Sequence, residues 1–433
     1  MKRALLFCAF VLLFFSQSFS QFILKAEYRP RFEYRSGYGQ LLTMDQDPVL
    51  TVSQRTRISS SYQTGILSFG LGIQDVRVWG DEDWYSTNSV VGDSASLDLN
   101  EAWIGIKPYE NGFIKIGRQY WIYEDERMLS QRNWNQSEVK YDGILYQNKL
   151  GKTQIDLGLS WNNKVDKAFT EPYPNNKMKS LNFIYIKRTI NDWLYVSATA
   201  LASGFLDNDS TNAINWMGTY GAYMSIKKGG LSALANGYYQ SGTSRFSGKT
   251  TSAYMFTVNG DYLIKKKFSI GAGIDYLSGH DQENSETGYQ EKSHAYDVLY
   301  GISHRYLGHM DLFSNLPKST KNAGLSDIFI RAKWYFKETS HLGADFHLFS
   351  LQTNVAYTVE DEIFYYDKNL GKELDFYCSW DINKIFNIKG GYSFFMASET
   401  MEKFQGVYGN ARFPNWAWIM LTAKPVFLDT TPK

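Results

Sequence analysis

The sequence predicts an all-β fold: a transmembrane antiparallel β-barrel of about 18 strands, with short periplasmic turns and long extracellular loops. Polar and apolar side chains alternate along several segments, and the links between these segments alternate between short and long. Aromatic residues make up 16% of the chain, yet the mean hydropathy is negative. This combination is typical of outer-membrane barrels, in which only alternate strand residues contact lipid. A large soluble all-β protein is the alternative.

The N-terminus has the features of a secretory signal peptide at residues 1–20. Two basic residues precede the apolar residues 4–15, and a small-x-small cleavage site follows at residues 18–20. The apolar run is too short for a membrane-spanning helix, and no later run reaches about 18 apolar residues. The sequence therefore predicts that residues 21–433 form one barrel domain in the bacterial outer membrane. Cleavage changes the net charge from +1 to −1, which gives no reason to expect a nucleic-acid partner.

Residues 22–35 form the clearest predicted strand. One face carries Lys25, Glu27, Arg29, Arg31, Glu33 and Arg35 at alternate positions. The positions between them are apolar or aromatic, and successive strand side chains point to opposite faces. The segment is longer than an ordinary strand of about five or six residues. It suits a tilted strand, which needs about nine to eleven residues to cross the hydrocarbon.

Further strands follow the same pattern. Alternation recurs at residues 51–62, 153–162, 254–262 and 325–336. In the segment 69–79 the apolar positions change phase between Ile73 and Val76, which predicts a β-bulge or a misplaced boundary.

The links support the strand count. Eight short links lie at residues 63–66, 108–112, 149–152, 189–192, 227–230, 264–267, 337–340 and 382–385. Nine longer links lie at residues 36–49, 80–96, 120–137, 163–179, 206–213, 240–251, 279–324, 354–371 and 397–414. Seventeen links join 18 strands, and an even number brings both chain ends to the periplasm. A barrel of this size encloses an aqueous channel unless loops fold inward.

No catalytic or metal-binding motif stands out. The sequence contains no G-x-S-x-G, H-E-x-x-H or phosphate-binding glycine loop, and Cys378 is the only cysteine after residue 20. Four histidines lie in the link 279–324, but their spacing fits no ligand pattern. We therefore expect neither an enzyme nor a cofactor or metal.

Arginine is distributed unevenly. Nine of the 14 arginines after residue 20 fall between residues 29 and 132. Arg29 and Arg31 share one strand face, and we expect Arg55 and Arg57 beside them on the lumen wall. Fixed guanidinium groups select anions in pores. The alternative is a braced wall in which Glu27, Glu33, Asp75 and Glu101 neutralise the arginines.

The chain resembles the alginate export family of outer-membrane proteins from residue 116 onward. The resembling motifs are Gly117-Arg118-Gln119, Glu126-Arg127-Met128-Leu129, Arg132-Asn133-Trp134-Asn135-Gln136 and Tyr141-Asp142-Gly143, supported by His304-Arg305-Tyr306-Leu307-Gly308-His309-Met310-Asp311, Lys389-Gly390-Gly391-Tyr392 and Trp416-Ala417-Trp418. The resemblance implies an 18-stranded barrel that passes an acidic polysaccharide through an arginine-rich lumen. It also implies that Arg118, Arg127, Arg132 and Asp142 belong to the constricted pathway.

The complete predicted pathway combines these motif residues with the strand arginines. It comprises Arg29, Arg31, Arg55, Arg57, Arg77, Arg118, Arg127, Arg132 and Asp142. The last periplasmic turn, which is long and acts as a gate in alginate exporters, is short here at residues 382–385. A gate would then come from the links 279–324 or 80–96 folding inward.

Two hypotheses for function follow. The first is a porin-like channel for anionic solutes, including an acidic polysaccharide such as alginate, embedded in outer-membrane lipid. The second is a barrel that conducts nothing and is an accessory subunit of a larger assembly, with protein partners in the outer membrane or periplasm. The aromatic residues of the link 279–324 motivate this alternative, because they could plug the lumen or present an apolar surface to a partner.

Overall fold

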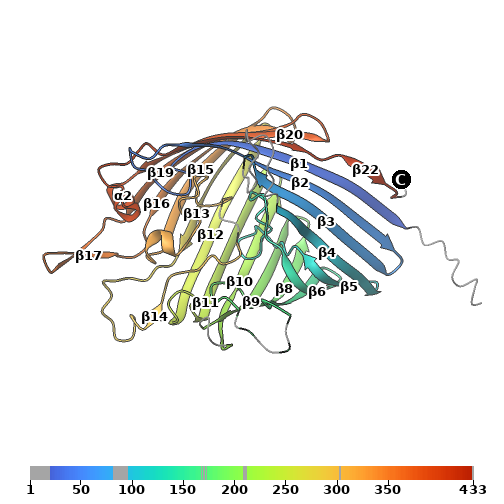
Figure 1. Cartoon of the computed structure of the whole chain (residues 1–433), viewed down its shortest axis with the longest axis horizontal. Helices are drawn as coiled ribbons and strands as arrows, with labels where there is room; N and C mark the ends of the chain where they lie inside the picture. Colours follow the sequence, from blue (N-terminus) through green and yellow to red (C-terminus); the bar gives the residue numbers. More distant parts are fainter. Residues whose placement is uncertain are drawn as a thin grey trace, which may run out of the picture.

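The chain forms a closed antiparallel β-barrel of 18 strands (Figure 1). The computed structural model describes residues 20–80, 96–166, 168, 171, 173–207, 212–301 and 304–431. Residues 1–19 of the predicted signal peptide and most of the predicted link 80–96 lie outside the described residues. The predicted fold class and strand number are confirmed.

The barrel strands follow one another around the wall in chain order. They are β1 (Gln21–Ser36), β2 (Val49–Thr64), β3 (Leu67–Val78), β4 (Ser96–Tyr109), β5 (Gly112–Gln119), β6 (Tyr141–Leu150), β7 (Thr153–Trp161), β8 (Ser180–Asn191), β9 (Leu194–Leu206), β10 (Ile214–Lys228), β11 (Leu231–Thr243), β12 (Thr250–Ile264), β13 (Phe268–Leu277), β15 (Leu325–Tyr335), β16 (His341–Ser350), β19 (Asn369–Asp381), β20 (Phe386–Ala397) and β21 (Asn415–Ala423). After a break at residues 424–425, β22 (Val426–Asp429) continues the last strand. Both β21 and β22 pair with β1, so the sheet closes without a free edge.

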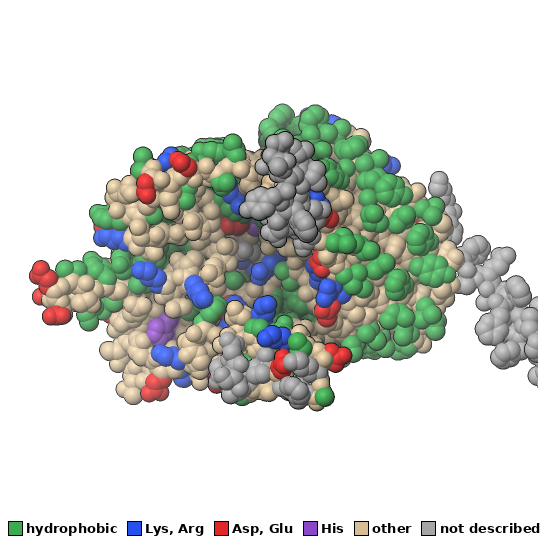
Figure 2. All heavy atoms as spheres, in the orientation of Figure 1, with side chains coloured by type: hydrophobic (Ala, Val, Ile, Leu, Met, Phe, Trp, Pro, Cys, Tyr) green, Lys and Arg blue, Asp and Glu red, His purple; other side chains and the backbone are tan. Residues whose placement is uncertain are grey.

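The outer face of β1 is apolar, as the alternation predicts. Tyr28 and Phe32 are 40% and 42% exposed, whereas Arg29 and Arg31 between them are only 5% exposed. Hydrophobic side chains also cover the outer surface over β1 to β5, at the right of Figure 2. An apolar outer face and a polar inner face are what a lipid-embedded barrel requires.

The two ends of the barrel differ in the length of their connections. Tight turns join the strands at one end, where Gly151 and Gly229 adopt φ values of +59° and +60° in two-residue links. Such turns favour glycine because they need positive φ. The other end carries the long loops, with the two-residue strand β14 (Lys292–Ser293), the 3₁₀ helix η1 (Lys318–Thr320), the hairpin β17 (Ala356–Val359) and β18 (Glu362–Tyr365), and the helix α2 (Glu399–Gln405). In Figure 1 this hairpin projects from the barrel at the left.

The hydrophobic core lies inside the barrel. It combines buried side chains of the inner wall and of other loops with those of two inward-folded connections. From residues 120–140 it includes Trp121, Met128 and Leu129; from residues 278–324 it includes Tyr296, Leu307, Met310, Leu312, Phe313 and Leu316. No helix in the described ranges is long and apolar enough to cross a membrane.

Candidate functional site

Residues 120–140, here called the inner segment, connect β5 to β6 through the lumen. The first set of contacts joins this segment to β1. Arg29 donates from Nη1 to the carbonyl oxygen of Asn133 at 2.8 Å and from Nη2 to Oε1 of Gln136 at 2.8 Å. Arg31 donates from Nη1 to the carbonyl oxygen of Trp134 at 2.8 Å. These arginines therefore bind the backbone and an amide of the inner segment.

Glu138 fastens the same part of the inner segment to β2. Its two carboxylate oxygens pair with Arg55 at 2.8 Å and with Arg57 at 2.5 Å, and its side chain is fully buried. Burial alone would raise the pKa of Glu138, but the positive charges of Arg55 and Arg57 outweigh it and lower the pKa. Arg55 also pairs with Glu27 from β1. This buried network holds the inner segment against the wall.

A β-bulge adds a further contact to this network. The register between β3 and β4 shifts at Gly72 and Ile73, which leaves Asn100 as an extra residue in β4. Asn100 is fully buried, donates to Gln74 at 3.0 Å and accepts from the Tyr120 hydroxyl at 2.8 Å. A bulge can re-aim a side chain, and here it turns Asn100 toward the inner segment. The irregularity predicted near Ile73 is present in the β3–β4 pair.

The opposite side of the inner segment contacts the far wall. Arg127 donates from Nη2 to both carboxylate oxygens of Asp275 on β13, at 2.6 and 2.7 Å. The Arg127 guanidinium also lies 3.7 Å from the ring centroid of Tyr306 and close to Asp125. Burial raises the pKa of Asp125, which accepts a hydrogen bond from Asn236 on β11 at 3.1 Å. The inner segment thus spans the lumen from β1 and β2 to β11 and β13.

The long loop of residues 278–324 packs on the inner segment. Arg132 donates to the carbonyl oxygens of Leu299 at 2.6 Å and Gly301 at 2.9 Å. The indole of Trp134 stacks on His304 with ring centroids 3.9 Å apart. The two connections therefore form one layer inside the barrel. Two links were predicted to fold inward. The link 279–324 does so, and most of the link 80–96 lies outside the described residues.

The structure separates the predicted pathway residues into two groups. Arg29, Arg31, Arg55, Arg57, Arg127 and Arg132 all bind the inner segment or belong to it. Arg77, Arg118 and Asp142 instead lie on the outer face. Arg118 pairs in register with Asp142 and donates to both of its carboxylate oxygens at 2.8 Å. Arg77 bonds Asp75 and is paired in register with Gln54, the neighbour of lumen-facing Arg55.

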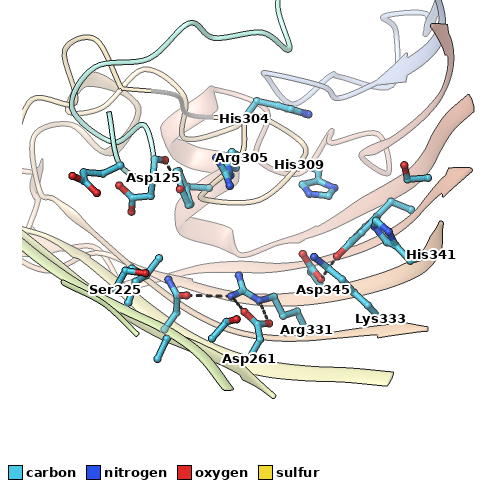
Figure 3. A pocket seen from close by; sticks show the side chains of 18 of the residues that line it. Asp125, Ser225, Asp261, His304, Arg305, His309, Arg331, Lys333, His341 and Asp345 are labelled. Carbon is cyan, nitrogen blue, oxygen red and sulfur yellow. Dashed lines mark hydrogen bonds and ion pairs between the residues drawn. The ribbon is translucent and has the colours of Figure 1, made fainter. Parts of the chain in front are cut away.

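A cavity of about 690 Å³, here called the lumen cavity, lies between this layer and the short-turn end of the wall (Figure 3). Its charged lining consists of Lys227, Arg305, Arg331, Lys333 and Lys389 with Glu124, Asp125, Asp261 and Asp345. Figure 3 shows Arg331, Lys333 and Asp345 on wall strands, facing His304, Arg305 and His309 from the long loop. Arg331 is bound to Asp261, with Nε 2.6 Å from Oδ1.

The three lysines of the lumen cavity differ from its arginines. Among the described residues, no carboxylate lies within 4.0 Å of the ammonium groups of Lys227, Lys333 and Lys389. None of these lysines is among the predicted pathway residues, although Lys333 lies on the charged face of an alternating segment. The same alternation that places arginines on the lumen face identifies Lys333 when lysine is counted with arginine. In the same described ranges, no three His, Cys, Asp or Glu side chains are grouped to hold a metal ion.

Comparisons with known proteins agree on the class of this barrel. The Acinetobacter baumannii proteins OccAB1 and OccAB4 superpose with TM-scores of 0.61 and 0.62, at 13% and 10% identity, covering 95% of this chain and 98% and 99% of theirs. The Pseudomonas aeruginosa outer membrane protein opdK superposes with a TM-score of 0.60 at 9% identity, over 94% of this chain and 99% of that chain. No curated protein sequence matches. The sequence model described as "Alginate export" matches residues 21–415, so the chain is an outer-membrane barrel that belongs to the alginate export family.

Proposed function

We propose that this outer-membrane channel passes anionic solutes, and that an acidic polysaccharide is among them. The observation that carries the proposal is the lysine set of the lumen cavity. Lys227, Lys333 and Lys389 reach a water-accessible cavity without a carboxylate partner in the described part of the chain. Rings of lysine and arginine favour anions in pores, provided that binding is weak enough for release.

In this proposal the arginines of β1 and β2 have a different task. Arg29, Arg31 and Arg55 are buried and bonded to the inner segment, so a passing solute cannot reach their guanidinium groups without displacing that segment. These contacts favour the braced-wall interpretation for this sector. The arginines fix the constriction, while the lysines of the lumen cavity attract the solute.

The scaffold hypothesis receives less support. Its motivation was the aromatic content of the long loop, but Tyr296 and Phe313 are each 1% exposed and pack inside the barrel. These side chains cannot present an apolar surface to a partner. If this packing closes the lumen completely, the barrel conducts nothing. A conductance measurement distinguishes such a closed barrel from a channel.

The double variant Lys333→Glu/Lys389→Glu tests the proposal. We expect the wild type to prefer anions and the variant to shift toward cations, because two unpaired positive charges in the cavity become negative. Reversal potentials of single channels in a salt gradient measure this. The control Lys368→Glu/Lys372→Glu makes the same charge change at the long-loop end, outside the lumen cavity. A wild type that prefers cations or conducts nothing would contradict the proposal.

A further inference from the structure

A second cavity, here called the wall pocket, lies on the inner wall between β4 and β9. It has a volume of about 480 Å³ and meets the lumen cavity at Glu124 and Tyr195, which line both. Its lining comes from strands β4 to β9 and from residues 120–124 of the inner segment. A volume of this size is in the range of about 300–1,000 Å³ that is usual for small-molecule sites.

The aromatic rings of the wall pocket lie against glycines of neighbouring strands. A Cβ atom added to Gly70 would come within 2.3 Å of the Trp103 indole, and one added to Gly105 within 2.5 Å of the Phe113 ring. Both rings therefore cover the backbone of the next strand instead of standing away from it. The Trp103 indole also has the Lys115 ammonium over it, 4.1 Å from the ring centroid. Phe113 is half-buried and lines the pocket, so its ring is the aromatic platform.

The polar groups of the wall pocket are held in fixed orientation. Asp156 is fully buried and accepts hydrogen bonds from Gln147 Nε2 at 2.7 Å, Gln154 Nε2 at 3.0 Å and the Tyr123 hydroxyl at 2.8 Å. Because each amide nitrogen is bound to Asp156, each amide oxygen is directed elsewhere. Within the described ranges the Oε1 atoms of Gln147 and Gln154 accept no hydrogen bond from the protein, so they can accept from a ligand hydroxyl.

The charge of the wall pocket is balanced. Lys115 and Lys187 oppose Glu124 and Asp156, and the two ammonium groups lie over aromatic rings, at 4.1 Å from the Trp103 centroid and 3.9 Å from the Tyr195 centroid. A pocket with equal numbers of positive and negative side chains does not favour an anion over a neutral solute. Its aromatic faces, amide oxygens and ammonium donors instead suit a ligand with an apolar ring face and many hydroxyl groups.

We propose that the wall pocket is a binding subsite for a hexopyranose unit of a neutral saccharide. The C–H face of the sugar ring packs on Phe113, and its hydroxyls donate to Gln147 and Gln154 and accept from Lys187. The proposal rests on the proposed function only in that the saccharide reaches the lumen. It does not depend on anion preference, which belongs to the lumen cavity.

Binding of neutral trisaccharides to the purified barrel tests the subsite. Tryptophan fluorescence and calorimetry would be recorded with mannotriose, cellotriose and galactotriose, and with succinate as a probe that is not a saccharide. We expect saturable binding of at least one trisaccharide, weakened about tenfold or more by Phe113→Leu. The matched control Phe376→Leu removes a 46% exposed phenylalanine from the outer face of β19 and should bind like the wild type.

The outcomes separate this inference from the channel proposal. Saccharide binding that is absent from the wild type, or unchanged in a folded Phe113→Leu variant, would overturn the subsite. If that variant does not fold, Lys187→Met provides the same comparison, because it removes the proposed ammonium donor. An anion-selective barrel that binds no trisaccharide contradicts only the subsite. A barrel that binds a trisaccharide without anion preference contradicts only the channel proposal.

Discussion

A channel carrying Arg55→Glu together with Arg57→Glu is expected to conduct several-fold more current than the wild type. Both arginines pair with the buried carboxylate of Glu138, and Arg55 also pairs with Glu27. The substitutions would place four carboxylates close together, and Glu138 would lose both of its arginine partners while Glu27 kept only Lys424, 3.3 Å away. Like charges at such distances disfavour the buried state strongly, so we expect residues 133–138 to leave the wall. Single-channel conductance in planar bilayers measures the widening.

The control for this prediction is Lys25→Glu. Lys25 lies on the same face of β1 but is exposed and makes no described contact with the inner segment. We expect its conductance to match the wild type. If the double arginine variant changed the reversal potential at unchanged conductance, the arginines would line an open path instead of holding the inner segment.

Replacement of Arg127 by Met is expected to release the inner segment from the far wall. The substitution keeps an apolar stem but removes the two hydrogen bonds that Arg127 donates to buried Asp275, which keeps only the one from Thr257, and leaves Asp125 without its nearby cation. Removing one partner of a buried ion pair costs about 3–5 kcal/mol. Hydrogen exchange of residues 120–140 should accelerate, and the open-channel current should become noisier and larger.

Arg305→Met serves as the matched control for Arg127→Met. Arg305 carries the same charge in the same lumen, but its side chain is 56% exposed and its ion pair with Glu126 is 3.3 Å long. Such exposed pairs contribute about 0–1 kcal/mol. Equal exchange rates in the Arg127 variant and the wild type would show that the far-wall contact does not hold the segment.

The barrel could be predicted from sequence because its rules are local. Side-chain alternation of period two and the sequence of short and long links depend on neighbouring residues. Together they determine the strand number, and the alternation places Arg29 and Arg31 on the face opposite to Tyr28 and Phe32. Turn glycines such as Gly229 mark the short-turn end for the same local reason.

The contents of the lumen could not be predicted in the same way. The partners of Arg29 lie 104 to 107 residues further along the chain, and those of Arg127 lie 148 residues further. No periodic pattern connects such distant positions. From the sequence, the inner segment is only a long link. Tertiary contacts place it across the lumen and bond it to the arginines, and the sequence does not show these contacts.

The outer-face position of three predicted pathway residues has a related cause. Arg118 and Asp142 were assigned by motif, and a motif does not state which face of a strand its residues occupy. In the structure they are direct cross-strand partners on the outer face, beside exposed Ile116 and Ile144. Arg77 follows the phase change of β3, where alternation alone leaves the face ambiguous.

The inner segment is expected to constrict the channel. This is measured by the single-channel conductance of a barrel in which residues 124–138 are replaced by a short Gly-Ser linker. The wall strands β5 and β6 and the lysines of the lumen cavity remain intact in this variant. We predict a several-fold rise in conductance with anion preference retained. A conductance equal to that of the wild type would contradict this expectation.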